Sequence, residues 1–410
     1  MSGGGTSVIN ASLAGILQAS RRSSKVNKTY IGINGILGLI HRELFDSDQL
    51  EDSSIELIKN TPACAFGTCR YKLKPYAEDP SDYQKIADTF RTFQISAFVY
   101  IGGNDSQDTA NKVQQACQSM NLDVACIGIP KTIDNDLVGT HCCPGYGSAA
   151  KYIATSTLEA SIDVASMHAT STKVFVLEVM GRHAGWLAAA SALARNTSQK
   201  APHIILMPER TIELSLLLDK VKDTVSDHGY AVIVASEGIK GTDGQLLSAQ
   251  KEVDAFGHSQ LGGVAPLLTK IIKQNLNLKC HWAVADYLQR SARHIASKFD
   301  VDIAHKLGQE ALQAIIDGKT GIMLTIEAQS TQTSTAIYEI SSIELDKVAN
   351  REKTLPDNYI ANHGMDVTQA FIDYAKPLVE GESYPDYHLG VPVYFSQPNK
   401  DYVKEDCLTD

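Results

Sequence analysis

The chain of 410 residues is 43% hydrophobic and 20% charged, which is typical of a globular protein with room for two domains. Its 37 basic and 47 acidic side chains give a formal net charge of -10, which argues against a nucleic-acid-binding surface. No apolar run approaches the roughly 18 to 20 residues that a membrane span needs. The eight cysteines form no CxxC pair and no secretory signal opens the chain, so we expect a cytoplasmic protein with reduced thiols.

Short apolar runs alternate with segments of helical periodicity, which predicts a parallel sheet with crossover helices and hence an α/β fold. The expected strands are 97–101, 124–129, 174–177, 203–207 and 231–234, and the expected helices are 10–20, 108–120, 148–166, 184–195 and 213–225. From about Tyr338 the composition shifts toward Pro, Asp and Tyr, and we expect an irregular, peripheral extension over 338–410.

The amino terminus carries a glycine-rich turn that leads into the first expected helix. Gly3 and Gly4 let backbone N–H groups approach a phosphate at the helix N-terminus. Only Met1 and Ser2 precede this turn, so the strand that usually feeds such a turn is not expected in this chain.

A second glycine turn follows the strand expected at 97–101. Gly102 and Gly103 precede Asn104, Asp105 and Ser106, which open a helix and predict a phosphate cradle. A helix N-terminus stabilises negative charge by roughly 0.3 to 1 kcal/mol. Taken alone, the motif is equally consistent with an ordinary turn in which Asp105 or Ser106 caps the helix.

The loop after the strand at 124–129 places Lys131 beside two carboxylates, those of Asp134 and Asp136. Ligands of parallel sheets bind beyond the carboxyl ends of the strands. One carboxylate can hold Mg²⁺ while the other accepts a proton from an attacking hydroxyl, and the lysine can bind phosphate. The alternative is a turn rich in Asp and Asn with a solvated lysine.

Three further segments carry candidate side chains at element ends. Arg182 offers a planar fork to a phosphoryl oxygen, whereas the neighbouring His183 is more typical of a structural histidine at a helix start. Glu209 can accept bonds from sugar hydroxyls, and Tyr287 with Arg290 can hold a distal phosphate. Taken alone, Glu209, Tyr287 and Arg290 are each more typical of a surface or capping group.

The ordered motifs GGNDS, PKTIDND, MGRHAG, PE and YLQRS resemble those of the phosphofructokinase family, from Ser2 to about Thr325. The resemblance implies two Rossmann-like three-layer α/β domains with mainly parallel sheets and an active site in the cleft between them. It places the donor in residues 1–140 with about 290–335, and fructose 6-phosphate in 141–289 with part of the C-terminal segment. It also implies a homodimer or homotetramer.

Two positions bear on the phosphoryl donor. Family members that use ATP are similar to GGDGS followed by GTIDND, with glycines where this chain has Asp105 and Lys131. A carboxylate at Asp105 would repel the α-phosphate of ATP, and Lys131 supplies positive charge to a small anion. The chain therefore resembles the pyrophosphate-dependent branch, which runs reversibly with Mg²⁺. An ATP-dependent kinase and a non-catalytic sugar-phosphate-binding paralogue without the first strand are the alternatives.

The resemblance implies a role for each matched residue. Asp134 would take the proton of the sugar 1-hydroxyl, while Thr132 and Arg182 would contact the transferred phosphoryl group. The implied sugar-binding residues are Thr132, Asp134, Met180, Gly181, Arg182, Glu209, Tyr287 and Arg290. The implied donor-binding residues are Gly3, Gly4, Arg70, Gly103, Asp105, Ser106 and Lys131, and the implied metal-binding residues are Asn104, Asp105, Asp134 and Asp136.

The chain also departs from the family pattern. Asn104 stands where many relatives carry an aspartate near the metal, which removes one charge. Lys173 and His281 lie near positions where relatives place arginines that reach a neighbouring subunit's 6-phosphate.

Overall fold

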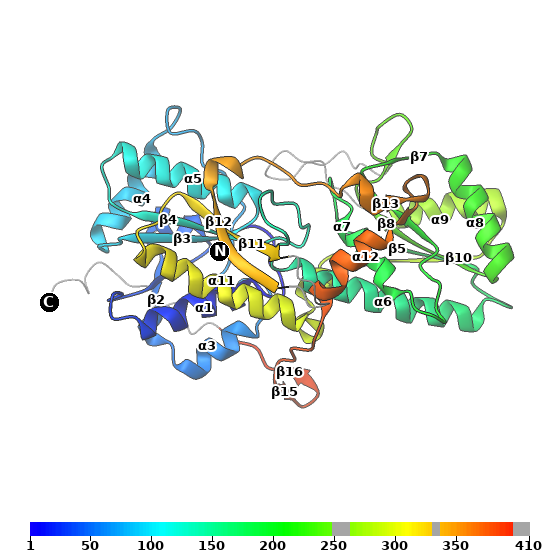
Figure 1. The fold of residues 1–410 in the computed structure, drawn as a ribbon, viewed down its shortest axis with the longest axis horizontal. Helices are drawn as coiled ribbons and strands as arrows, with labels where there is room; N and C mark the ends of the chain where they lie inside the picture. The colour runs from blue at the N-terminus through cyan, green and yellow to red at the C-terminus, as the bar shows by residue number, and fades with distance from the viewer. Residues whose placement is uncertain (248–262, 330–336, 397–410) are drawn as a thin grey trace.

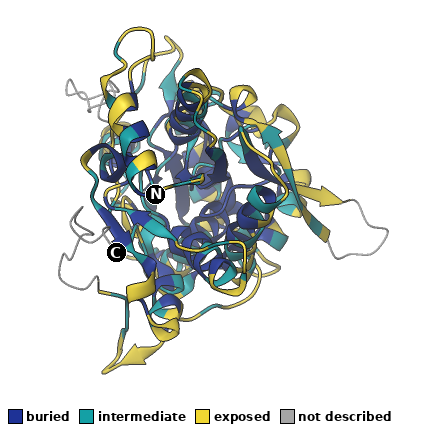
Figure 2. Ribbon diagram, turned by 90° about the vertical axis from the view of Figure 1, so that its left-hand side faces the viewer, coloured by how far each residue is buried: buried dark blue, intermediate teal, exposed yellow. Residues whose placement is uncertain are grey.

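The computed structural model describes residues 1–247, 263–329 and 337–396, which form two α/β units side by side (Figure 1). Each unit is built on a four-stranded sheet, with the strand orders β12-β11-β4-β3 and β10-β5-β8-β6. The sheets and the helices against them hold most of the buried residues (Figure 2). The predicted α/β fold with mainly parallel sheets is therefore confirmed.

The first sheet combines strands from two distant parts of the chain. Strands β3 (Ala97–Gly102), β4 (Ala125–Pro130) and β11 (Ile322–Gln329) are parallel, and β12 (Ile337–Glu344) runs antiparallel beside β11. Helices α4 (Ser81–Thr92) and α5 (Asn104–Ser119) cover one side, and α1 (Ile9–Arg22) and α11 (Lys298–Ile316) cover the other (Figure 1).

Helices α1 and α11 cross at two glycines. A Cβ atom at Gly15 would lie 2.1 Å from the carbonyl oxygen of His305, and one at Gly308 would lie 2.1 Å from that of Ser12. Because no side chain fits in these spaces, the two backbones approach each other closely. The first and last helices of this unit therefore pack as one layer.

The second sheet is wholly parallel. Its strands are β5 (Val174–Val179), β6 (Ile204–Leu206), β8 (Ala231–Ser236) and β10 (Cys280–Val284). Val176 and Ile233 face α8 (Leu214–His228) and α9 (Val264–Leu276), whereas Leu177 and Val234 face the side of α7 (Trp186–Ala190). The long helix α6 (Tyr146–Met167) lies along that side of the unit (Figure 1).

Shorter elements complete both units. They include β1 (Tyr30–Gly32), α2 (Ile36–His41), β2 (Leu44–Asp46), α3 (Asp52–Lys59), the 3-10 helix η2 (Ser191–Ala194), β7 (Thr211–Ile212), β9 (Lys240–Gly241), α10 (Leu288–Ser291), β13 (Ile360–Ala361), β14 (Asp366–Val367), α12 (Gln369–Ala375), β15 (Tyr387–His388) and β16 (Val391–Pro392). The ten predicted strands and helices all overlap observed ones, although the helix expected at 184–195 is split between α7 and η2.

The expectation that the segment from Tyr338 is peripheral is wrong for residues 338–396, although most of 345–396 is irregular or forms only short elements, as expected. Strand β12 pairs with β11 along its whole length, and Leu345, Val348 and Phe371 are completely buried. The Pro- and Tyr-rich composition gave a wrong prediction of burial, because this segment places single apolar side chains into cores that are built mainly by the rest of the chain. Residues 397–410 of that expectation lie outside the described residues.

Two expectations about the class of protein can be compared with the described residues. All seven cysteines in that part of the chain are free, and Cys407 lies outside it. None of its helices combines the length and apolar character that crossing a membrane requires.

Candidate active site

The predicted phosphate cradle lies where β3 ends. Gly103 caps α5, and the N–H of Lys131, directly after β4, donates to the carbonyl oxygen of Gly102 (3.1 Å). The Lys131 ammonium group reaches back to the amino-terminal turn and donates to the carbonyl oxygen of Gly4 (2.7 Å). The structure thus brings the two glycine turns and Lys131 together, as predicted from the order of the motifs.

Lys131 is a buried cation, with 3% of its surface exposed. Burial lowers its pKa, and the nearby positive charge of Arg290 acts in the same direction, whereas Asp134 opposes them. Few groups in the described structure neutralise it directly, so an anionic ligand beside the Gly4 turn would be strongly attracted.

Arg290 lies next to this turn. A Cβ atom at Gly4 would be 2.7 Å from the Nη1 atom of Arg290, and the guanidinium stacks 3.9 Å from the ring centroid of Tyr287. Tyr287 itself is 59% exposed. The predicted pair is therefore brought together, and its arginine faces the amino-terminal turn rather than lying far from the donor side.

The two carboxylates after β4 share a partly buried position. Burial, followed by the charges of Asp136 and Glu237, raises the pKa of Asp134 to about 7. Burial also raises the pKa of Asp136, whose Oδ1 atom is buried without a hydrogen-bond partner among the described residues. The charges of Lys131 and Lys353 oppose these shifts, for Asp134 and Asp136 respectively, without cancelling them.

The backbone of this loop is held by its own side chains. The N–H of Asp134 donates to Oγ1 of Thr132 (3.0 Å), and Asn135 has a left-handed backbone with φ of 54°. The amide oxygen of Asn135 accepts the N–H of Cys143 (3.0 Å), and its amide nitrogen bonds to the hydroxyl of Tyr374 (2.7 Å). Helix α12 of the C-terminal segment therefore supports the loop that carries both carboxylates.

The predicted sugar-binding loop follows β5. Gly181 donates its N–H to Oε1 of Glu237 (3.3 Å), and Met180 donates its N–H to Oε1 of Gln289 (3.2 Å). Burial raises the pKa of Glu237, and the charge of Arg182 opposes this shift. Glu237 was not predicted from the sequence. Its signal was its place directly after the apolar strand that ends at Ser236, where ligand-binding residues of parallel sheets are often found.

Glu209 and His183 both contact the C-terminal segment. Oε1 of Glu209 accepts the N–H groups of Gly185 and Leu355 (2.8 Å each), and its Oε2 is buried without a partner among the described residues. His183 and Glu352 pair at 2.8 Å with side chains 48% and 43% exposed. This geometry favours a structural role for His183, as the sequence suggested.

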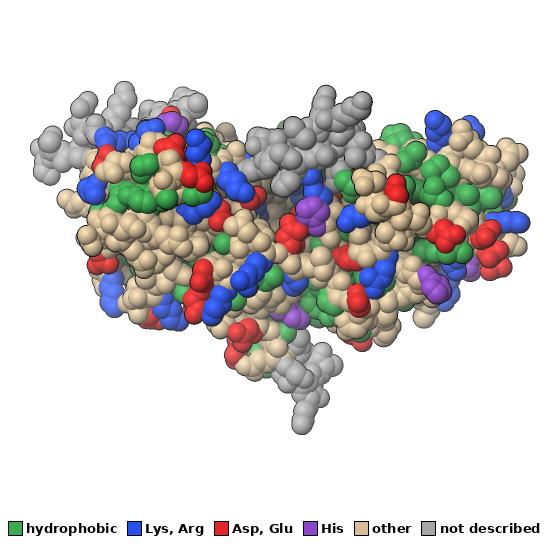
Figure 3. Space-filling model, turned by 90° about the horizontal axis from the view of Figure 1, so that it is seen from above, with side chains coloured by type: hydrophobic (Ala, Val, Ile, Leu, Met, Phe, Trp, Pro, Cys, Tyr) green, Lys and Arg blue, Asp and Glu red, His purple; other side chains and the backbone are tan. Residues whose placement is uncertain are grey.

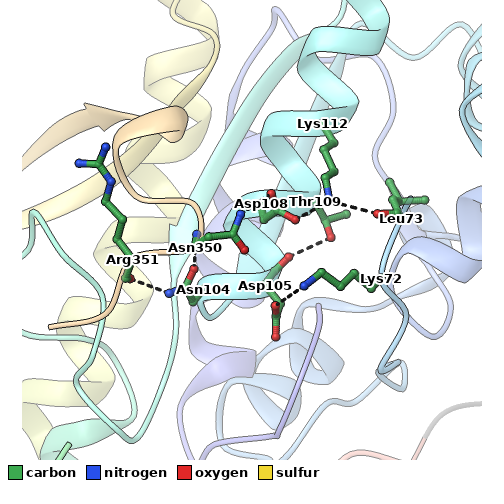
Figure 4. Close-up of polar contacts among 9 residues, drawn as sticks. All are labelled: Lys72, Leu73, Asn104, Asp105, Asp108, Thr109, Lys112, Asn350 and Arg351. Atoms are coloured by element: carbon green, nitrogen blue, oxygen red, sulfur yellow. Dashed lines mark hydrogen bonds and ion pairs between the residues drawn. The ribbon is translucent and has the colours of Figure 1, made fainter. Parts of the chain in front are cut away.

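Asn104 and Asp105, at the start of α5, point in different directions (Figure 4). Asp105 is about half exposed and lies 3.9 Å from the ammonium group of Lys72. The Asn104 oxygen accepts the N–H of Asn350 (2.7 Å), and its nitrogen donates to the carbonyl oxygen of Arg351 (2.6 Å). Because both ends of this amide are engaged, Asn104 is a poor candidate for a metal ligand.

The carboxylate pair fits a magnesium ion better than any larger cluster does. The described residues contain no group of three or more His, Cys, Asp or Glu side chains arranged around one point. Mg²⁺ in phosphoryl-transfer sites is typically held by one or two carboxylates, with water and substrate phosphates completing the shell. The unpartnered Oδ1 of Asp136 and the raised pKa of Asp134 match that pattern.

Two of the remaining predicted residues adjoin this centre, and the other two lie at the amino-terminal ends of β5 and β10, opposite to the loop that follows β5. Ser106 is buried at the start of α5, and Arg70 is exposed beside Cys69, whose carbonyl oxygen accepts the N–H of Gly3. Lys173 precedes β5 and His281 lies exposed on the adjacent edge strand β10. Charged side chains of both signs gather at the middle of the face shown in Figure 3.

A glycine cradle, a buried lysine and two carboxylates at the end of the first sheet, with Arg290 beside them, form the kind of site that binds and transfers phosphoryl groups. Residues 1–315 match the family described as phosphofructokinase, and the chain belongs to this family. It is 48% identical to the pyrophosphate–fructose 6-phosphate 1-phosphotransferase of Halomonas elongata over 95% of this chain and 93% of the relative. The enzyme of that name from Methylococcus capsulatus is 45% identical over 97% and 94%.

A solved structure agrees with these relatives. The pyrophosphate-dependent phosphofructokinase from Marinobacter aquaeolei matches with a TM-score of 0.88 and 45% identity, covering 98% of this chain and 96% of that one. The fold of the two units is therefore that of the pyrophosphate-dependent members of the family.

Proposed function

We propose that the protein transfers a phosphoryl group from pyrophosphate to the 1-hydroxyl of fructose 6-phosphate, reversibly, releasing orthophosphate. The observation that carries the choice of donor is the buried ammonium group of Lys131, bonded to the Gly4 turn beside the cradle at Gly103. A compact anion with two phosphates matches a buried cation between two glycine turns. The names of the relatives from Halomonas and Methylococcus support the same donor.

In the proposed mechanism, Asp134 accepts the proton of the sugar 1-hydroxyl as the oxygen attacks the phosphoryl group. A pKa of about 7 suits a base that works near neutral pH. Thr132 and Arg182 contact the transferred group, and Lys131 with Gly103 and Ser106 holds the departing orthophosphate. Asp134 and Asp136 would hold Mg²⁺, which neutralises charge on the donor oxygens when bound. Positioning and charge supply most of the catalysis.

The sugar would lie on the side of the second sheet. Met180, Gly181 and Arg182 line it, and Glu237, which is bonded to Gly181, joins Glu209 as an acceptor for sugar hydroxyls. Tyr287 and Arg290 would bind phosphate. On this proposal, the unit of residues 1–140 with about 290–335 binds the donor, and the unit of 141–289 with part of the C-terminal segment binds the sugar.

Three further properties belong to this proposal. The enzyme works with Mg²⁺, it acts in the cytoplasm, and it assembles as a homodimer or homotetramer. In such an assembly, Lys173, just before the inner strand β5, and His281, on the edge strand β10, would approach the 6-phosphate bound by a neighbouring subunit.

A coupled assay tests the donor directly. Purified enzyme, fructose 6-phosphate and Mg²⁺ are combined with either pyrophosphate or ATP, and product formation is followed. We expect turnover with pyrophosphate and little with ATP. Preference for ATP would overturn the donor argument, and sugar-phosphate binding without turnover would indicate a non-catalytic paralogue.

The double variant Asp105→Gly with Lys131→Gly probes the same choice from the protein side. It removes the buried cation and the carboxylate at the cradle, so we expect pyrophosphate-dependent turnover to fall by more than about tenfold. Retention of the wild-type rate would show that neither side chain recognises the donor.

A further inference from the structure

Residues 350–357, which we call the strap, cross from the first unit to the second (Figure 1). The strap follows β12 and Val348, which anchors it in the first unit's core. Within eight residues it bonds to the start of α5, to the carboxylate loop, and to loops of the second unit. No role in the reaction described above uses it.

The first attachment is a two-way clasp between Asn104 and the strap. The N–H of Asn350 donates to the side-chain oxygen of Asn104. The side-chain amide nitrogen of Asn104 donates to the carbonyl oxygen of Arg351. Figure 4 shows this carbonyl facing Asn104 while the Arg351 guanidinium points away. Asn350 has a left-handed backbone with φ of 59°, a conformation that asparagine tolerates better than most residues.

The Asn350 side chain extends the clasp along α5. Its amide nitrogen donates to Oδ1 of Asp108 (3.0 Å), whose Oδ2 pairs with Lys112 at 2.7 Å. Lys112 in turn donates to the carbonyl oxygen of Leu73 (3.0 Å). Asp108, at the centre of this chain of bonds, is 5% exposed, whereas Asn350 itself lies exposed on the strap.

The second attachment holds the carboxylate loop. The N–H of Lys353 donates to the carbonyl oxygen of Asp136 (2.6 Å). The Lys353 ammonium group donates to the carbonyl oxygens of Thr140 (3.0 Å) and His141 (3.1 Å). One strap residue therefore fixes both ends of the loop that begins at Asp136.

The third attachment reaches the second unit. The indole N–H of Trp186 donates to the carbonyl oxygen of Lys353 (3.2 Å), and the N–H of Leu355 donates to Glu209 (2.8 Å). Asp357 pairs with Arg210 at 2.9 Å. The strap is thus bonded at one end to the donor cradle and at the other to the end of β6.

We propose that Asn350 is a positioning residue for the phosphoryl donor: through Asn104 and Asp108 it sets the cradle against the carboxylate loop. The inference rests on the proposed function. Asn104 is on this view the partner of the strap and not a magnesium ligand. The neutral amide is required because a carboxylate at this position cannot donate a hydrogen bond to the carbonyl oxygen of Arg351. It would instead repel that oxygen.

Two variants test the proposal, with Asn277→Gly as a matched control. Asn350→Gly keeps the left-handed backbone accessible and removes the bond to Asp108; Asn277 is also left-handed but exposed at the end of α9, remote from the strap. We expect Asn350→Gly to raise KM for pyrophosphate by about three- to tenfold, with KM for fructose 6-phosphate within about twofold. Asn277→Gly should change neither constant.

Asn104→Asp separates the strap from a metal role by the sign of its effect. If Asn104 acts through the strap, the aspartate raises KM for pyrophosphate by about tenfold and leaves the Mg²⁺ requirement unchanged or higher. If the position binds magnesium, the added carboxylate lowers the Mg²⁺ concentration at half-maximal rate. The second result would overturn the proposal.

A rescue variant completes the test. Asp108→Asn combined with Asn350→Asp reverses the donor and acceptor of the bond, and it should recover part of the KM increase seen with Asn350→Asp alone. Melting followed by circular dichroism shows which variants fold. If an Asn350 variant does not fold, the KM values of Asn104→Asp are compared with wild type instead. Equal changes in both substrate constants, or no recovery on reversal, would reduce the strap to a structural element.

The two claims fail separately. Wild-type enzyme that works only with ATP contradicts the proposed donor, and the same variant ratios are then measured for the KM of ATP. If wild-type enzyme is active with pyrophosphate but Asn350→Gly leaves the KM values for both substrates unchanged, only the positioning role of the strap is contradicted.

Discussion

Asp105 and Asp134 follow neighbouring parallel strands, each beside a lysine, yet their surroundings differ. Asp105 is about half exposed and stands 3.9 Å from Lys72. Asp134 lies among Asp136, Glu237 and the buried Lys131, and its pKa rises to about 7. The same residue type after neighbouring strands can therefore be a solvated surface charge or a carboxylate with a strongly raised pKa, and burial is the largest cause of the difference.

Lys72 and Lys131 also differ in how strongly each can attract an anion. An exposed ion pair contributes little, typically below about 1 kcal/mol, because water screens it. A cation with 3% exposure acts through a much lower effective dielectric and attracts an anionic ligand more strongly. Variants at the two strand ends should consequently differ by orders of magnitude in their effects.

The largest expected effect comes from removing the buried carboxylate. We expect Asp134→Ser to lower kcat by roughly 10² to 10⁴, the range for loss of a general base. Asp302→Ser, in an exposed pair with Lys298 on α11, is the matched control and should keep wild-type turnover. Near-normal kcat in the Asp134 variant would remove the base assignment.

The pH profile gives the next largest effect. Because Asp134 must be deprotonated to accept a proton, kcat/KM should fall about tenfold per pH unit below a pKa of about 7. A bound cation favours the carboxylate, so raising the Mg²⁺ concentration should move this limb to lower pH. A profile that stays flat from pH 5 to 8 at every Mg²⁺ concentration would contradict both statements.

Stability should show a smaller effect of the same burial. The folded-state pKa of Asp134 lies above the ordinary value of 3.8, so folding binds a proton between about pH 4 and 7 and stability falls as pH rises through that window. In magnesium-free enzyme at pH 8, Asp134→Asn should raise Tm by roughly a few degrees, and the gain should vanish near pH 4. Thermal melting across this range measures it, and a constant difference would exclude titration as its cause.

The exposed strand end gives the smallest effect. Lys72→Ala removes the partner of Asp105, and we expect less than about a threefold change in KM for pyrophosphate and no measurable change in Tm. The steady-state comparison is made at low and at high salt, because screening should erase even this difference. A tenfold change would place Lys72 among the groups that hold the donor.

Much of the site could be predicted because its residues follow strands in order. The apolar runs at 97–101 and 124–129 located the turn at Gly103 and the carboxylates at Asp134 and Asp136, since parallel strands end at one edge. The motifs around Arg182 and Arg290 predicted the part of the site that follows β5 and β10 of the second sheet.

The remainder depended on contacts between distant segments. Nothing local marks Asn350 or Lys353, because their backbone and side-chain groups bond to residues more than a hundred positions away. Composition alone made the C-terminal segment look peripheral, although Phe371 is buried and Tyr374 supports the carboxylate loop. Such insertions leave no periodic signal.

The close crossing of α1 and α11 has a consequence for biosynthesis. All strands of the second sheet lie within residues 174–284, whereas the first sheet needs β3 and β4 together with β11 and β12, up to Glu344. Domains generally fold as units while the chain emerges from the ribosome. The unit encoded in the middle therefore completes its sheet first, and α1, made at the very start, waits until α11 emerges to pack against Gly15.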